Sequence, residues 1–145
     1  MAKIDSIEKN KTIVIKPIRY ENRGEEWVIC EIQFLVDDKK IFQTIESVLQ
    51  DYELESLVIN LENILDNKII NYNSDFIEPN FEIKFNRSSS SEDIKVFADF
   101  ARGDDYNNRK NETNYYKAID FFADKTSLKL FIRELEVELK NLREI

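Results

Sequence analysis

The sequence predicts a single α+β domain, residues 1–145, in which a largely antiparallel sheet is covered on one face by two amphipathic helices. Segments of alternating apolar and polar residues follow one another at hairpin distance, as antiparallel strands do. Two other segments carry apolar residues at intervals of three and four, which is typical of helices with one buried face. The chain has only 2 glycines and 2 prolines, so long regular elements are favoured over loops.

The first half, about residues 11–67, is expected to contain three strands and a helix. Lys11–Tyr20 is rich in β-branched residues, and Pro17 inside it indicates an edge strand or a bulge. Trp27–Val36 has one wholly apolar face and is the clearest strand. A tight turn at Asp37-Asp38-Lys39 leads into a third strand, Lys40–Ile45.

The predicted helix of this half spans roughly Asp51–Asn67, and its acidic residues, Glu53 among them, are expected to face water. Lys68–Tyr72 fits either a short strand or an extended linker. The apolar stripe of the helix is formed by Leu54, Leu57, Val58, Leu61, Ile64 and Leu65.

The second half, about residues 75–143, repeats this order, although no residue-level repeat demonstrates a duplication. Three strands are expected at Phe81–Phe85, Ile94–Ala101 and Tyr115–Phe122, and a long polar loop, Arg102–Asn114, separates the last two. The aromatic pairs of the last strand are interpreted as core residues. A final helix is expected to run to about residue 142, capped by Thr126 or Ser127.

The composition excludes several classes of chemistry. The chain has no histidine, which removes histidine-based acid–base catalysis, Ser-His and Cys-His nucleophiles and histidine metal sites. Cys30, the single cysteine, lies in an apolar strand and is expected to be a buried free thiol. There is no Gly-rich phosphate loop, and the close acid pairs lie in predicted turns rather than converging on a metal. The sequence therefore predicts no enzymatic activity, no cofactor and no metal site.

Charge and hydropathy restrict the partners. The 21 basic and 29 acidic residues give a net charge of −8, which disfavours nucleic acid and suits a basic protein partner or simple solubility. No apolar run approaches the roughly 20 residues of a membrane span, and the first residues are polar. We therefore expect a cytoplasmic protein that contacts neither membrane nor nucleic acid.

The order of motifs resembles a known family. An aromatic-initiated strand, Trp27–Ile32, is followed by a hairpin return and an amphipathic helix; Phe76–Ile83 then leads into a further strand, and a second amphipathic helix closes the chain. This arrangement, from about Ile13 to Leu142, resembles the WapI-type family of bacterial immunity proteins, with Tyr20 and Glu78-Pro79 as the best matches. The long loop Arg102–Asn114 matches no pattern of the family.

The resemblance implies an immunity protein that occludes a cognate toxin domain of a polymorphic or contact-dependent toxin, nucleases among them, without catalysis. An acidic protein would suit a basic toxin surface. The candidate contact residues are Asp37, Asp38, Asp104, Asp105 and Tyr106, whose acids are equally consistent with solvated loops. The alternative function is a structural or adaptor module, which would show an apolar patch and self-association. The oligomeric state is not predicted.

Overall fold

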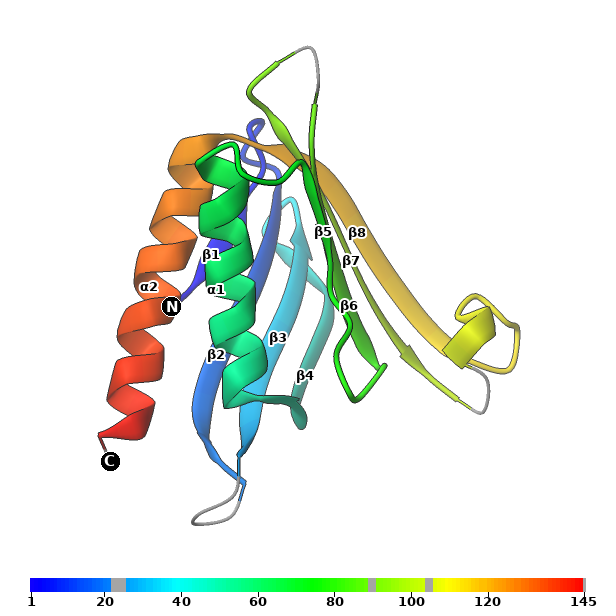
Figure 1. Ribbon diagram of the computed structural model, residues 1–145. Coiled ribbons are helices and arrows are strands. Elements are labelled where there is room, and N and C mark those ends of the chain that lie inside the picture. The colour runs from blue at the N-terminus through cyan, green and yellow to red at the C-terminus, as the bar shows by residue number, and fades with distance from the viewer. Residues whose placement is uncertain (22–25, 89–90, 104–105, 145) are drawn as a thin grey trace.

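The computed structural model describes residues 1–145 except 22–25, 89–90, 104–105 and 145. Within these described residues the chain forms two antiparallel four-stranded sheets and two α-helices (Figure 1). The predicted α+β class is confirmed. The strands form two sheets, and each sheet begins with a short strand: β1 (Lys3–Asp5) was not expected, and β5 (Asn71–Asn73) overlaps the segment Lys68–Tyr72, for which a short strand was one of two alternatives.

The first sheet has the strand order β1-β2-β3-β4. Its strands are β1 (Lys3–Asp5), β2 (Lys11–Tyr20), β3 (Trp27–Val36) and β4 (Lys39–Gln50). The short strand β1 pairs only with residues 12–14 of β2, so the part of β2 around Pro17 is a free edge. The pairing of β2 with β3 also shifts register after Pro17, which confirms the bulge.

The second sheet has the strand order β5-β6-β7-β8. Its strands are β5 (Asn71–Asn73), β6 (Phe81–Arg87), β7 (Ile94–Arg102) and β8 (Tyr115–Ala123), with a short 3₁₀ helix, η1 (Tyr106–Asn108), between β7 and β8. The segment that fitted either a strand or a linker therefore ends in a strand, β5.

The helices are α1 (Asp51–Leu65) and α2 (Lys125–Arg143), which lie side by side in Figure 1. The expectation that Glu53 faces water is wrong. Its carboxylate accepts hydrogen bonds from the backbone N–H groups of Gln50 and Ile77, both at 2.9 Å, and the residue is only 5% exposed. Because Glu53 is the third residue of the helix, its carboxylate can reach back to an unpaired N–H group at the helix start.

The predicted cap of the last helix is also wrong. Asp124 is the N-cap of α2, and its carboxylate accepts a hydrogen bond from the backbone N–H of Ser127 at 2.8 Å. The Ser127 hydroxyl is occupied elsewhere, since it accepts from the N–H of Asp5 at 3.0 Å and donates to the Asp5 carbonyl at 3.1 Å. Ser127 thereby attaches β1 to α2.

Both sheets and both helices contribute to one hydrophobic core. The Phe42 ring of β4 lies 5.0 Å from that of Phe34 and 4.7 Å from that of Phe100 in β7, so aromatic contacts join the two sheets. Cys30 is buried in this core, as expected, and burial raises the pKa of its thiol to about 12.

Candidate partner-binding surface

Asp37 and Asp38, the first predicted contact residues, form the turn between β3 and β4. Their φ angles are 50° and 65°, values that Asp tolerates and that two-residue hairpin loops require. Both side chains are exposed. The Asp37 N–H donates to the carbonyl of Asn10 at 2.7 Å, which fixes the turn against the β1–β2 connection. Two carboxylates are thus presented to solvent on an ordered hairpin.

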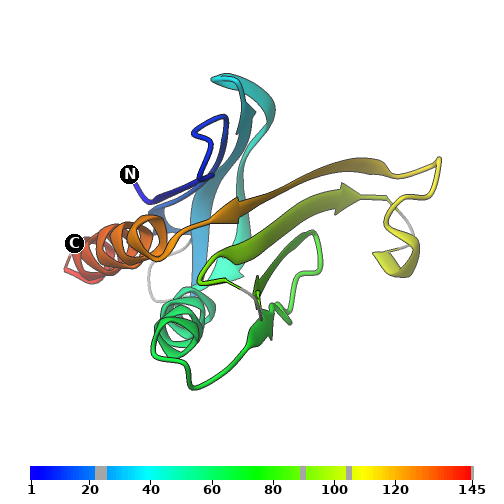
Figure 2. The ribbon, with the colours of Figure 1, turned by 90° about the horizontal axis from the view of Figure 1, so that it is seen from above.

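The second group lies in the β7–β8 connection. Asp104 and Asp105 fall outside the described residues, and of Tyr106 only the backbone, at the start of η1, is described. Figure 2 shows that the β3–β4 turn, in cyan, and the β7–β8 connection, in yellow, project in different directions. The structure therefore does not bring Asp37 and Asp38 together with Tyr106.

Arg109 anchors the β7–β8 connection on the outer face of the second sheet. Its Nε donates to Asp99 Oδ2 at 3.0 Å, and its Nη2 donates to Asp99 Oδ1 and to the Asn80 carbonyl, both at 2.8 Å. Glu82, directly opposite Asp99 on β6, lies 3.5 Å from Nε. The side chains of Arg109 and Asp99 are only 12% and 4% exposed. Such a two-pronged, nearly buried ion pair fixes both partners in one geometry.

Both ends of the connection are held by further contacts. Arg102 forms an ion pair with Glu46 of β4, and its Nη2 donates to Thr44 Oγ1 at 3.1 Å. Beyond η1, Lys110 Nζ lies 5.8 Å from the centre of the Tyr116 ring. Burial, followed by the negative charge of Asp99 and a hydrogen bond to it, raises the pKa of Tyr116 to about 12. The phenol therefore stays protonated beside the Arg109–Asp99 pair at neutral pH.

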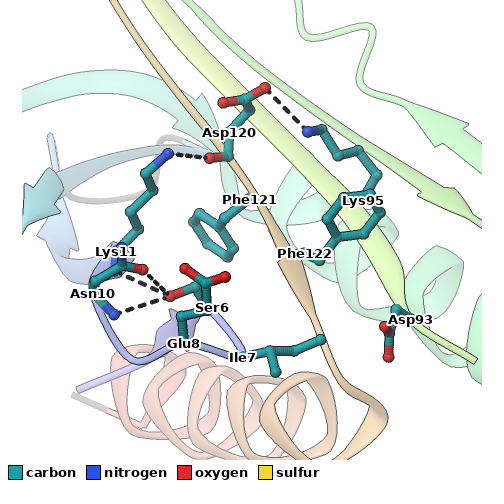
Figure 3. Close-up of a pocket in the computed structure, with 10 residues that line it drawn as sticks. All are labelled: Ser6, Ile7, Glu8, Asn10, Lys11, Asp93, Lys95, Asp120, Phe121 and Phe122. Carbon is teal, nitrogen blue, oxygen red and sulfur yellow. Dashed lines mark hydrogen bonds and ion pairs between the residues drawn. The ribbon is translucent and has the colours of Figure 1, made fainter.

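A hollow of about 440 Å³ lies where the β1–β2 connection meets the edge of β8 (Figure 3). Two lysines bind the same residue there: Lys11 Nζ donates to the Asp120 carbonyl at 3.1 Å, and Lys95 Nζ lies 3.1 Å from Asp120 Oδ2 (Figure 3). The Ile7 N–H donates to the carbonyl of Phe122 at 2.9 Å. The hydrogen bonds of Lys11 and Ile7 therefore join the first sheet and its β1–β2 connection to β8, whereas the Lys95 ion pair lies within the second sheet.

The core interpretation of the aromatic pairs holds only in part. Phe121 is buried, but Phe122 and Tyr115 are about half exposed. The pleat of β8 turns Phe121 and Phe122 to opposite faces. Lys95 Nζ lies 4.8 Å from the centre of the exposed Phe122 ring.

The Arg109–Asp99 pair was missed by the sequence analysis. The available signal was Asp99 itself, an acid inside the apolar segment Ile94–Ala101. A carboxylate buried in a strand needs a cation or several donors, and the next loop contains Arg102, Arg109 and Lys110. The sequence does not indicate which of the three reaches back.

The described residues thus form an acidic α+β protein with an anchored surface loop, without three His, Cys, Asp or Glu side chains grouped to hold a metal ion. No described helix is long and apolar enough to span a membrane. The model of the immunity protein WapI-like family matches residues 3–143, and the chain belongs to this family. The resemblance identified from the sequence is confirmed. No curated protein and no solved structure matches the chain.

Proposed function

We propose that this protein binds a cognate bacterial toxin domain in the cytoplasm and neutralises it by covering a surface that the toxin needs. Membership of the WapI-like immunity family, over residues 3–143, is the observation that carries this proposal. The net charge of −8 supports a basic toxin surface, such as the substrate-binding face of a nuclease, because complementary charge accelerates the encounter. The mechanism is occlusion and requires no catalytic group.

In this proposal the toxin contacts Asp104, Asp105 and Tyr106 in the β7–β8 connection, or Asp37 and Asp38 in the β3–β4 turn. The ion pair between Arg109 and Asp99 supports the first surface, because it holds the residue three positions after Tyr106 on the sheet, and a surface held in place loses less conformational entropy on binding. The β3–β4 turn and η1 project in different directions (Figure 2), so each candidate surface can be tested separately.

The test is a titration with the toxin domain encoded next to this gene, at low and high salt, together with an assay of toxin activity. We expect nanomolar or tighter binding that weakens with salt and abolishes toxin activity. The paired variant Asp104→Asn/Asp105→Asn should bind about 10-fold more weakly, through slower association. Asp37→Asn/Asp38→Asn tests the second surface in the same way.

The control variant is Glu8→Gln/Glu78→Gln, which removes the same charge at two other exposed positions. Its affinity should change less than about 2-fold. No binding at either salt concentration would exclude neutralisation of that toxin. Equal losses in all three paired variants would exclude both proposed surfaces and leave neutralisation intact.

A further inference from the structure

A groove of about 700 Å³ lies between α1 and α2. Its buried floor includes Val58 of α1 and Leu139 of α2, and above them Ile59 and Val137 are 57% and 53% exposed. Exposed aliphatic side chains on both walls of a groove are a feature of surfaces that bury apolar groups of a partner.

Two carboxylates meet in the middle of this helical surface. Glu62 of α1 and Glu136 of α2 line both the groove and its continuation, a hollow of about 420 Å³ beside Leu65 and Ile132. Burial, followed by a hydrogen bond to Glu62 and its negative charge, raises the pKa of Glu136. Among the described residues, neither carboxylate has a cation within 4.0 Å.

The cations of the groove lie to either side of this carboxylate pair. Arg143, at one end, forms ion pairs with Asp51 and Glu55 and is therefore not available to the carboxylate pair. Lys140 and Glu144 line the same end. Lys129, Arg133 and Asp66 line the other end. The middle of the groove, beside Ile59 and Val137, therefore carries two carboxylates whose charge is not neutralised by an ion pair in the described part of the chain.

We propose that this groove binds an amphipathic helix of a protein partner, which inserts one arginine between Glu62 and Glu136 and packs apolar side chains on Ile59 and Val137. A guanidinium can donate to two carboxylates at once in a fixed plane, which an ammonium cannot do. A third helix fits between two adjacent helices by packing its side chains into their groove. The inference does not depend on the proposed toxin surface, which lies on strand connections.

The experiment uses two capped helical peptides of about 15 residues, built from Ala, Leu and Gln, one with a single central arginine and one with glutamine in its place. Calorimetric titration should show the arginine peptide binding at least about 10-fold more tightly to the wild-type protein. Glu62→Gln/Glu136→Gln should abolish this preference, whereas the control Glu8→Gln/Glu78→Gln should retain it.

A second variant tests the apolar contacts. Ile59→Gln/Val137→Gln replaces two exposed side chains and should weaken both peptides by about 10-fold while keeping the preference for arginine. Far-ultraviolet circular dichroism checks that each variant is folded. If Glu62→Gln/Glu136→Gln does not fold, the single variant Glu136→Gln replaces it. Absence of binding, equal affinity for both peptides, or a preference that persists without the two carboxylates would overturn the proposal. The toxin titration is independent, so either result can stand without the other.

Discussion

Arg109 and Asp99 form an ion pair that joins the β7–β8 connection to the outer face of β7, with distances of 3.0 Å from Nε to Oδ2 and 2.8 Å from Nη2 to Oδ1. The same guanidinium donates to the Asn80 carbonyl just before β6. One side chain thus holds three segments together. Because the Asp99 side chain is almost fully buried, the pair affects stability more than a surface ion pair would.

Replacing Arg109 with methionine should lower the free energy of unfolding by about 3 kcal/mol, because it leaves the buried Asp99 carboxylate without its cation. Urea denaturation measures this loss. Adding Asp99→Asn should recover part of it, since the unpaired charge is then removed. The control is Lys110→Met, at a neighbouring cation whose Nζ lies 5.8 Å from the centre of the Tyr116 ring, with an expected loss below about 0.5 kcal/mol. Similar small losses in both single variants would contradict the anchoring role.

Glu53→Ala should cost about 2 kcal/mol of unfolding free energy. One carboxylate accepts the N–H groups of Gln50 at the start of α1 and of Ile77 before β6, so the change leaves two donors without their partner. Thermal or urea denaturation gives the total loss, and hydrogen exchange at the Ile77 amide should accelerate. Glu78→Ala, at an exposed acid one residue further along, is the control. An unchanged exchange rate at Ile77 would show that this hydrogen bond does not restrain the loop.

The elements that the sequence predicted are those determined by local periodicity and turn chemistry. The alternation in Trp27–Val36 and the three-four spacing in both helices depend only on neighbouring residues, and Asp37-Asp38 favours a tight turn through its own backbone preferences. These elements appear where expected. Glu53 and Ser127 were misassigned because their hydrogen bonds to Ile77 and Asp5 join segments far apart in the sequence.

The remaining features depend on partners that local patterns do not specify. The strands β1 and β5 have three residues each, too few to show a period, and form because β2 and β6 offer an edge. Strands at hairpin distance can belong to one sheet or to two. The spacing therefore could not reveal that the strands before α1 and the strands after α1 form separate sheets. For the candidate surface, the sequence located the loop but not Arg109, which anchors it. The α1–α2 groove required the relative placement of both helices.

Glu136→Gln should make stability less dependent on pH. A carboxyl group whose pKa is raised in the folded state opposes folding above that pKa, and the penalty disappears as the pH falls through it. At neutral pH the variant should therefore be more stable than the wild type by about 0.3 kcal/mol, a small value because the pair is exposed. The gain should decrease below the raised pKa and vanish below the pKa of Glu136 in the unfolded chain, where the carboxyl is protonated in both states. Urea titrations at the two pH values measure it, with Glu78→Gln as control; a gain that persists in acid would exclude repulsion from Glu62 as its cause.

Cys30 should report on global unfolding. Its side chain is buried and the pKa of its thiol is raised to about 12, so the folded protein should react very slowly with a disulfide reagent at neutral pH, and the denatured protein should react fast. If labelling requires unfolding, its rate follows the population of the open state. Arg109→Met, destabilised by about 3 kcal/mol, should then be labelled about 100-fold faster than the wild type, while Lys110→Met keeps the wild-type rate. Equal rates in the two variants, despite a measured difference in stability, would show that Cys30 is reached by a local opening of β3 and not by unfolding of the shared core.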